Sequence, residues 1–302
     1  MRSIEWIVDR ATASRNVQAE IVSFFLWPER TVAQWDADLT AIAVARLAEL
    51  KARVVLRSQA ENLDNTLAQI EGTSRKIVRL GKTRYRNQRV NLAMFESVDI
   101  TGVSRDATIR EGREVLETWL SVEAAWEPSE DLTSGSFGSL LAAAEAQQIL
   151  WLRKHTEWRR KALIVEDLAV KLDDLNVAWY SDATAELPEG TVAGNLVRTV
   201  PTTYNPPPGV GQAVLSNLMV TADGAVHFDA EAPHATRMTY LHKGPGMQEY
   251  EVVVADTTQR SLTYHHALPG LHLFKAFGEN SGGAGADSPP LTVEVQAQAN
   301  VA

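Results

Sequence analysis

With 302 residues, of which 45% are hydrophobic and 22% charged, the chain is long enough for two domains, and its composition excludes disorder throughout. The net charge of −9 at pH 7 argues against a protein that coats nucleic acid. The absence of cysteine excludes disulfide bonds, thiol catalysis and cysteine-ligated metal centres, and leaves the compartment open.

The first residues do not form the apolar segment of a signal peptide, because Glu5, Asp9 and Arg10 interrupt it. The longest apolar run, residues 21–27, is far shorter than the roughly 20 residues that cross a bilayer. We therefore expect no membrane segment. Both a cytoplasmic protein and one exported by a non-classical route fit this sequence.

Two helices are predicted in the first quarter of the chain. An amphipathic pattern over residues 3–26 indicates the first, which ends before Pro28 because the residue preceding proline is disfavoured in a helix. Residues 29–71 contain neither glycine nor proline and indicate a long second helix. Ser58 and Glu61 form an S-x-x-E capping pattern, so this stretch is either one helix or two.

The segment between residues 72 and 138 is more varied. It begins with basic residues and continues through a β-prone stretch, residues 90–103. A further helix is predicted at about residues 104–125, with Ser104 as its N-cap. Residues 127–138 are acidic and rich in serine and glycine, which indicates a solvated turn between helices.

The most regular stretch is residues 139–187, which contain no glycine or proline. Alternating steps of three and four residues give an apolar stripe with a seven-residue repeat and three polar interruptions. Continuous helix over residues 140–180 would span roughly 60 Å, so we expect an elongated molecule. The stripe consists of Leu141, Ala144, Gln148, Trp151, His155, Trp158, Ala162, Val165, Ala169, Leu172, Asn176 and Trp179.

Part of this stretch is a candidate subunit interface. Four consecutive apolar residues cannot all face one neighbouring helix, and exposed apolar surface usually marks an interface. A polar residue in the stripe, His155, is typical of positions that set register or oligomeric state. The candidate interface comprises Ile149, Leu150, Trp151, Leu152 and His155, and we expect the C-terminal half of the stripe to pack within the protomer.

Composition changes after residue 187. Residues 188–212 are rich in proline and predict a semi-rigid linker. In residues 213–302 the apolar period falls to two, and Gly, Asp, Asn or Pro turns separate the segments, as in a β-sandwich. The predicted organisation is a helical domain, residues 1–187, a Pro-rich linker and a β-sandwich domain.

Three motifs in the C-terminal region resemble a known family. They are VHFDA at residues 226–230, KGPG at 243–246 before Tyr250, and LPGxHxFxAxxxNxxG at 268–283. These resemble the B strand, the C to C′ turn and the F strand of a fibronectin type III domain over about residues 217–298. Phe228 stands where such domains usually carry a core tryptophan, and His272 where the tyrosine-corner residue is expected.

The resemblance implies a binding or spacer module and specifies no chemistry. The predicted fold class is therefore multi-domain α plus β, with an elongated long-helix bundle followed by an immunoglobulin-like (fibronectin type III-like) β-sandwich.

A basic patch lies in the middle of the chain. Phosphate or nucleic acid would be its functional partner. The alternative is a solvated or subunit-facing surface whose charge complements acidic stretches of the chain. The net negative charge of the chain favours this alternative. Nucleic acid is therefore not an expected partner. The patch consists of Arg75, Lys76, Arg79, Lys82, Arg84, Arg86 and Arg89.

Residues suited to catalysis or metal binding do not form a recognisable set. His265, His266 and His272 resemble a metal site, but neighbouring residues on a strand point to opposite faces, so we interpret them as strand surface. We expect no catalytic, cofactor-binding or metal-binding residues and no cofactor.

The leading hypothesis is a non-enzymatic structural protein that self-assembles into a homo-oligomeric filament, tube or sheath-like object. The β-sandwich would then be a surface or inter-subunit module. The alternative is an adhesive or ligand-binding protein, in which the helices form a stalk and the sandwich binds a protein or glycan. An enzyme with a helical active site would require a concave pocket with convergent polar groups, which the sequence does not indicate.

Overall fold

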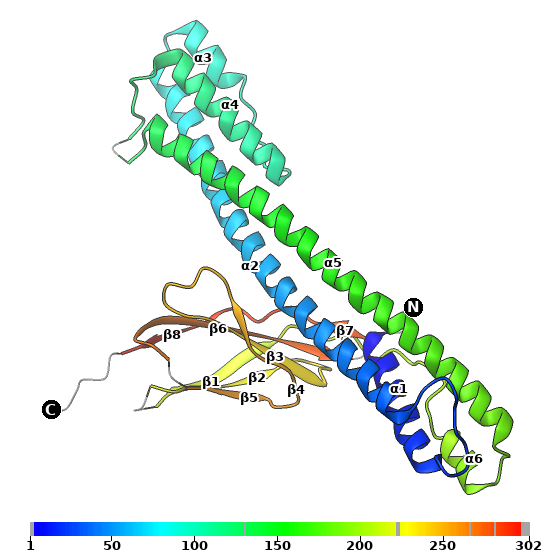
Figure 1. The fold of residues 1–302 in the computed structure, drawn as a ribbon. Helices are drawn as coiled ribbons and strands as arrows, with labels where there is room; N and C mark the ends of the chain where they lie inside the picture. Colours follow the sequence, from blue (N-terminus) through cyan, green and yellow to red (C-terminus); the bar gives the residue numbers. More distant parts are fainter. Residues whose placement is uncertain (1–2, 130, 222–223, 266, 281, 297–302) are drawn as a thin grey trace. The chain divides into compact units, whose positions relative to one another are not determined.

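The computed structural model describes residues 3–129, 131–221, 224–265, 267–280 and 282–296. A long helical region is followed by antiparallel β-sheets, as predicted (Figure 1). The chain divides into two compact units, which we call the terminal unit, Met1–Val54 with Trp158–Ala302, and the middle unit, Val55–Glu157. The predicted domain boundaries, at residues 187 and 213, stay a prediction.

Two of the helices, α2 and α5, contain 53 residues each and run through both units. At 1.5 Å per residue each is about 80 Å long. Helix α2 continues through the possible cap at Ser58, so this stretch is one helix. The helices are α1 (Ile4–Ile21), α2 (Val32–Arg84), α3 (Arg89–Glu96), α4 (Arg105–Glu123), α5 (Ser134–Glu186) and α6 (Val192–Val197).

Side chains at the N-termini explain where several helices begin. The predicted cap of α4 is confirmed, because Ser104 accepts a hydrogen bond from the backbone nitrogen of Ala107 at 3.2 Å. A reciprocal capping box opens α2: Thr31 N donates to Gln34 Oε1 at 2.8 Å, and Gln34 N donates to Thr31 Oγ1 at 3.3 Å. These bonds satisfy backbone donors that a free helix end leaves unpaired.

The sequence-based prediction of β structure at residues 90–103 is wrong: the first part forms α3, and residues 97–103 are in neither helix nor strand. The reason is packing: Phe95 is fully buried, stacked on Tyr85 with ring centroids 5.8 Å apart and against the edge of Trp126 at 5.9 Å. Tertiary burial of one aromatic ring outweighs a weak local preference for strand.

The middle unit is held together by close approach of α4 to α2 and α5. A Cβ atom at Gly112 would lie 2.8 Å from both Ile70 of α2 and Leu141 of α5, so only glycine allows this packing. Trp119 of α4 is fully buried and donates its indole N–H to the carbonyl of Trp126 at 2.8 Å. One aromatic and aliphatic core therefore links the helices of this unit.

In the terminal unit α1 and α6 pack against α2 and α5 around a second core. Trp35 of α2 and Trp179 of α5 are both fully buried there, which confirms that the C-terminal half of the predicted stripe packs within the protomer. Helix α6 lies inside residues 188–212, the predicted Pro-rich linker, and its Val197 is buried in the same core. Part of this segment is therefore a short packed helix.

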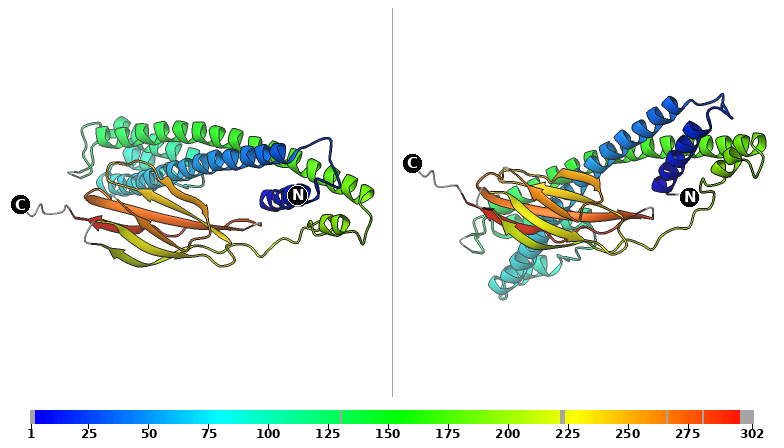
Figure 2. Two further views of the ribbon diagram at one scale, coloured as in Figure 1. Left: turned by 60° about the horizontal axis from the view of Figure 1, so that its bottom comes forward. Right: turned by 90° about the horizontal axis from the view of Figure 1, so that it is seen from below.

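The C-terminal strands form two antiparallel sheets that face each other (Figure 2). One has the order β1-β2-β5, and in the other β3 and β6 are central, flanked by β4, β7 and β8. Phe228 of β2 packs against Tyr240 of β3 and Phe274 of β6, so both sheets enclose one core. The strands are β1 (Val214–Val220), β2 (Val226–Glu231), β3 (Arg237–Lys243), β4 (Glu251–Thr257), β5 (Ser261–Tyr264), β6 (Gly270–Asn280), β7 (Gly283–Ala284) and β8 (Leu291–Val295).

Candidate functional site

The solvent-facing side of α5 carries large apolar side chains in a row with a seven-residue spacing. We define the α5 row as Ile149, Leu163, Val170 and Val177, with Thr156 completing the repeat. The four apolar side chains are 54%, 49%, 57% and 47% exposed, respectively. This row lies on the opposite side of the helix from the buried stripe, since positions such as Val165, Leu172 and Trp179 are in the core.

The predicted subunit interface coincides with the row only in part. Ile149, Leu150 and Leu152 are exposed at 54%, 38% and 52%. Trp151 and His155 are half-buried and in ring contact with each other at 5.5 Å, and the guanidinium of Arg105 lies 4.6 Å from the Trp151 ring. The structure thus separates the five predicted residues into three exposed ones and two that pack within the middle unit.

The seven residues of the predicted basic patch are all exposed. Three contact neighbouring groups of the middle unit: Arg75 pairs with Glu71, Lys76 donates to Ser129 at 3.2 Å, and Arg84 pairs with Glu123 at 3.0 Å. Hydrogen bonds from the Tyr85 hydroxyl and from Arg84 hold the pKa of Glu123 below its usual value. These contacts favour the interpretation of the patch as a surface whose basic side chains contact neighbouring groups of the same unit.

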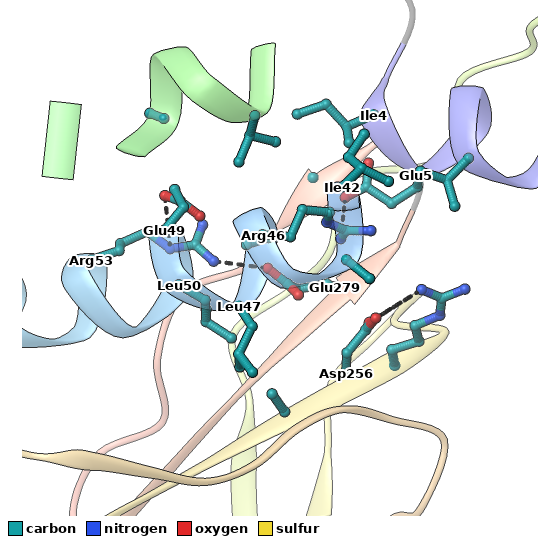
Figure 3. Close-up of a pocket in the computed structure, with 18 of the residues that line it drawn as sticks. Ile4, Glu5, Ile42, Arg46, Leu47, Glu49, Leu50, Arg53, Asp256 and Glu279 are labelled. Atoms are coloured by element: carbon teal, nitrogen blue, oxygen red, sulfur yellow. Dashed lines mark hydrogen bonds and ion pairs between the residues drawn. The ribbon is translucent and has the colours of Figure 1, made fainter. Parts of the chain in front are cut away.

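A cavity of about 410 Å³ lies in the terminal unit between helices α1, α2 and α5 and the ends of strands β3, β4 and β6 (Figure 3). Several of the polar side chains that line it take part in hydrogen bonds or ion pairs. Arg46 donates to Glu5 at 2.9 Å and Arg53 donates to Glu279 at 2.9 Å, while Glu49 accepts a hydrogen bond from the Trp158 indole at 2.6 Å.

One of these pairs connects a helix to the sheet, and the other two connect helices to each other. Arg53 of α2 bonds Glu279 of β6 and lies 5.4 Å from the ring of Phe277, beside a small cluster in which Leu50 and Val54 pack on the sheet. The cavity is therefore best explained by packing of the sheet on the helices.

Two buried histidines lie next to each other on neighbouring strands, His242 on β3 and His272 on β6. His272 Nε2 is 2.6 Å from the carbonyl oxygen of Leu268, and its Nδ1 is 2.8 Å from His242 Nε2. A carbonyl only accepts, so His272 donates to it from Nε2. Burial lowers the pKa of His242 although Glu251, 3.3 Å away, favours its charged form.

The interpretation of His272 as strand surface is wrong, because its side chain is 2% exposed. Pairing of β6 with β3 brings His272 next to His242. The sequence pattern did not single out His242. His266 lies outside the described residues. Among the residues that the structure describes, no group of three or more His, Cys, Asp or Glu is placed to hold a metal ion.

In comparisons with known proteins, no family model matches this sequence, and no curated protein matches it either. The resemblance to fibronectin type III domains stays a prediction. Of the helices in the described part of the chain, none is both long and apolar enough to span a membrane.

Proposed function

We propose that this is a non-enzymatic structural protein that assembles with copies of itself into a homo-oligomeric filament, tube or sheath-like object. The α5 row is the observation that carries the proposal. Four aliphatic side chains, each about half exposed, stand in line on one helix face. Burying the exposed part of each would contribute about 1 kcal/mol, and such surface on a folded protein usually marks an interface.

We also propose that the C-terminal sheets form a fibronectin type III-like sandwich. Its support is the combination of the three motifs with antiparallel strands in two sheets around one core, in which Phe228 takes the place expected of tryptophan. In the assembly this sandwich would be a surface or inter-subunit module. The elongated shape that the helix lengths suggest stays a prediction.

Light scattering on the full chain over about 1–100 µM, the range in which weak assemblies form, tests self-assembly. We expect a mass well above 33.2 kDa that rises with concentration. A mass of one protomer throughout that range would contradict the proposal.

The adhesive alternative has one observation in its favour. Strand β1 is at the edge of its sheet and exposes Val214, Met219 and Val220 at 59%, 58% and 46%. An exposed edge strand is a site where another strand can add. A chain that remains monomeric in light scattering yet binds immobilised protein or glycan would favour this second function.

A further inference from the structure

The α5 row is symmetric about its central residue. Ile149 and Val177 stand fourteen residues on either side of Leu163, and Thr156 and Val170 stand seven residues on either side. If a second α5 helix ran in the opposite direction with Leu163 facing Leu163, every other member of the row would face another member. Such a contact would extend over about 45 Å at 1.5 Å per residue.

Charged residues beside the row share this symmetry with opposite signs. Arg153 and Arg160 precede Leu163, whereas Asp167 and Asp174 follow it. Arg160 and Asp167 are three and four residues from Leu163, and Arg153 and Asp174 are ten and eleven. An antiparallel second helix would therefore place each arginine beside an aspartate.

The four charges are free to make such contacts. All are exposed, and within the described part of the chain none takes part in an ion pair or hydrogen bond. Arg160 and Asp167 are separated by seven residues, about 10 Å along the helix, which is too far for an ion pair within one chain.

We propose that the exposed face of α5 binds the α5 helix of a second copy of this chain, antiparallel, around a two-fold axis near Leu163. Leu163 packs against the partner's Leu163, and Ile149 packs against the partner's Val177. Arg160 pairs with the partner's Asp167, and Arg153 with the partner's Asp174. This inference rests on the proposed function, for which it names the partner and the surface.

The charge order selects the antiparallel orientation. In a parallel, in-register pair each arginine would face an arginine and each aspartate an aspartate, and like charges at close range oppose association. The exposed flanking pairs set orientation more than affinity, which comes from the apolar row. A two-fold contact of this kind closes on itself, so a larger assembly requires a second surface.

Charge reversal on the full chain tests the inference, with the dissociation constant measured by sedimentation velocity. Arg160→Asp and Asp167→Arg should each weaken self-association at least tenfold, because each places like charges together twice across the axis. The double variant Arg160→Asp/Asp167→Arg should return the constant to within about threefold of the unaltered chain. Leu163→Glu should weaken association at least as much as either single reversal.

Lys51→Asp, a reversal at an exposed residue of α2, is the matched control and should leave the dissociation constant unchanged. Circular dichroism should show that every variant is folded, since all these positions are exposed. If both single reversals weaken association and the double variant does not restore it, the antiparallel pairing is wrong. If the chain assembles and none of the α5 variants weakens it, assembly uses another surface and this inference fails while the proposed function stands. If the unaltered chain does not associate, both fail.

Discussion

Replacing Trp35 with alanine is expected to lower the free energy of unfolding of the terminal unit by about 3–5 kcal/mol. The side chain is fully buried and stacks on Trp27 with ring centroids 6.0 Å apart. Its indole N–H also donates to Gln18 Oε1 at 2.7 Å, and Gln18 is itself 4% exposed. The substitution therefore opens a large cavity. It also leaves the buried side-chain oxygen of Gln18 without the indole N–H that donates to it.

Urea unfolding followed by circular dichroism measures this effect, and Phe24→Ala is its control. Phe24 lies just after α1 and is 69% exposed, so its loss should change the free energy of unfolding by less than about 0.5 kcal/mol. Equal effects of the two substitutions would show that the core of the terminal unit is not built around Trp35.

Replacing Glu111 with alanine should destabilise the middle unit by about 2–3 kcal/mol, the usual effect of losing hydrogen bonds to a charged group. Its side chain is 5% exposed and accepts hydrogen bonds from the backbone nitrogens of Thr101 and Gly102, at 3.0 and 3.1 Å, and from the Thr101 hydroxyl at 2.5 Å. These bonds fix the turn before α4 to the helix itself. Without the carboxylate, that turn loses its anchor.

The same carboxylate should make stability depend on pH. Burial raises the pKa of Glu111, but the hydrogen bonds from Thr101 and Gly102 outweigh it, so the pKa lies below its ordinary value of 4.5. The unfolded chain therefore binds more protons near that value, so the stabilisation is full above pH 4.5 and is lost as the pH falls below it.

Thermal unfolding at several pH values checks both statements about Glu111. Glu111→Ala should lower the melting temperature at neutral pH and reduce its fall in acid, whereas Glu117→Ala, at an exposed position of the same helix, should do neither. An unaltered pH profile in Glu111→Ala would contradict the assigned role of this carboxylate.

The long helices could be predicted because their signals are local and repeated. Absence of glycine and proline, together with the seven-residue stripe, indicated α5 before any contact was known. Helix α2 extends to Arg84, through Gly72 and Gly81, because burial of Ile77 and Val78 stabilises helix beyond the region that composition marked. Local preference could not anticipate that burial.

Features that depend on distant residues were not predictable. Helix α3 forms because Phe95 fills a space between Tyr85 and Trp126, and His272 is buried because strand register brings it to His242. Neither contact has a signature within its own segment. Packing on neighbouring segments therefore determines both the formation of α3 and the burial of His272.

The interface predicted from the sequence and the contact face proposed from the structure lie on the same helix, α5, but share few residues. Four consecutive apolar residues drew attention to one turn, and one exposed member of that set, Ile149, remains in the proposed contact face. Only burial of the other stripe showed which side of α5 is exposed, and hence that Leu163, Val170 and Val177 continue the row. Their spacing was readable, but their exposure was not.

Single-cysteine crosslinking tests the proposed assembly most directly, because the chain contains no cysteine of its own. Leu163→Cys places a thiol beside its equivalent across the axis, so a short bis-maleimide should join two chains. In Val177→Cys the two equivalent thiols would be about 40 Å apart along an antiparallel pair and should not be joined. Crosslinking of both variants to the same extent, or of neither at concentrations where the chain associates, would contradict antiparallel assembly through α5.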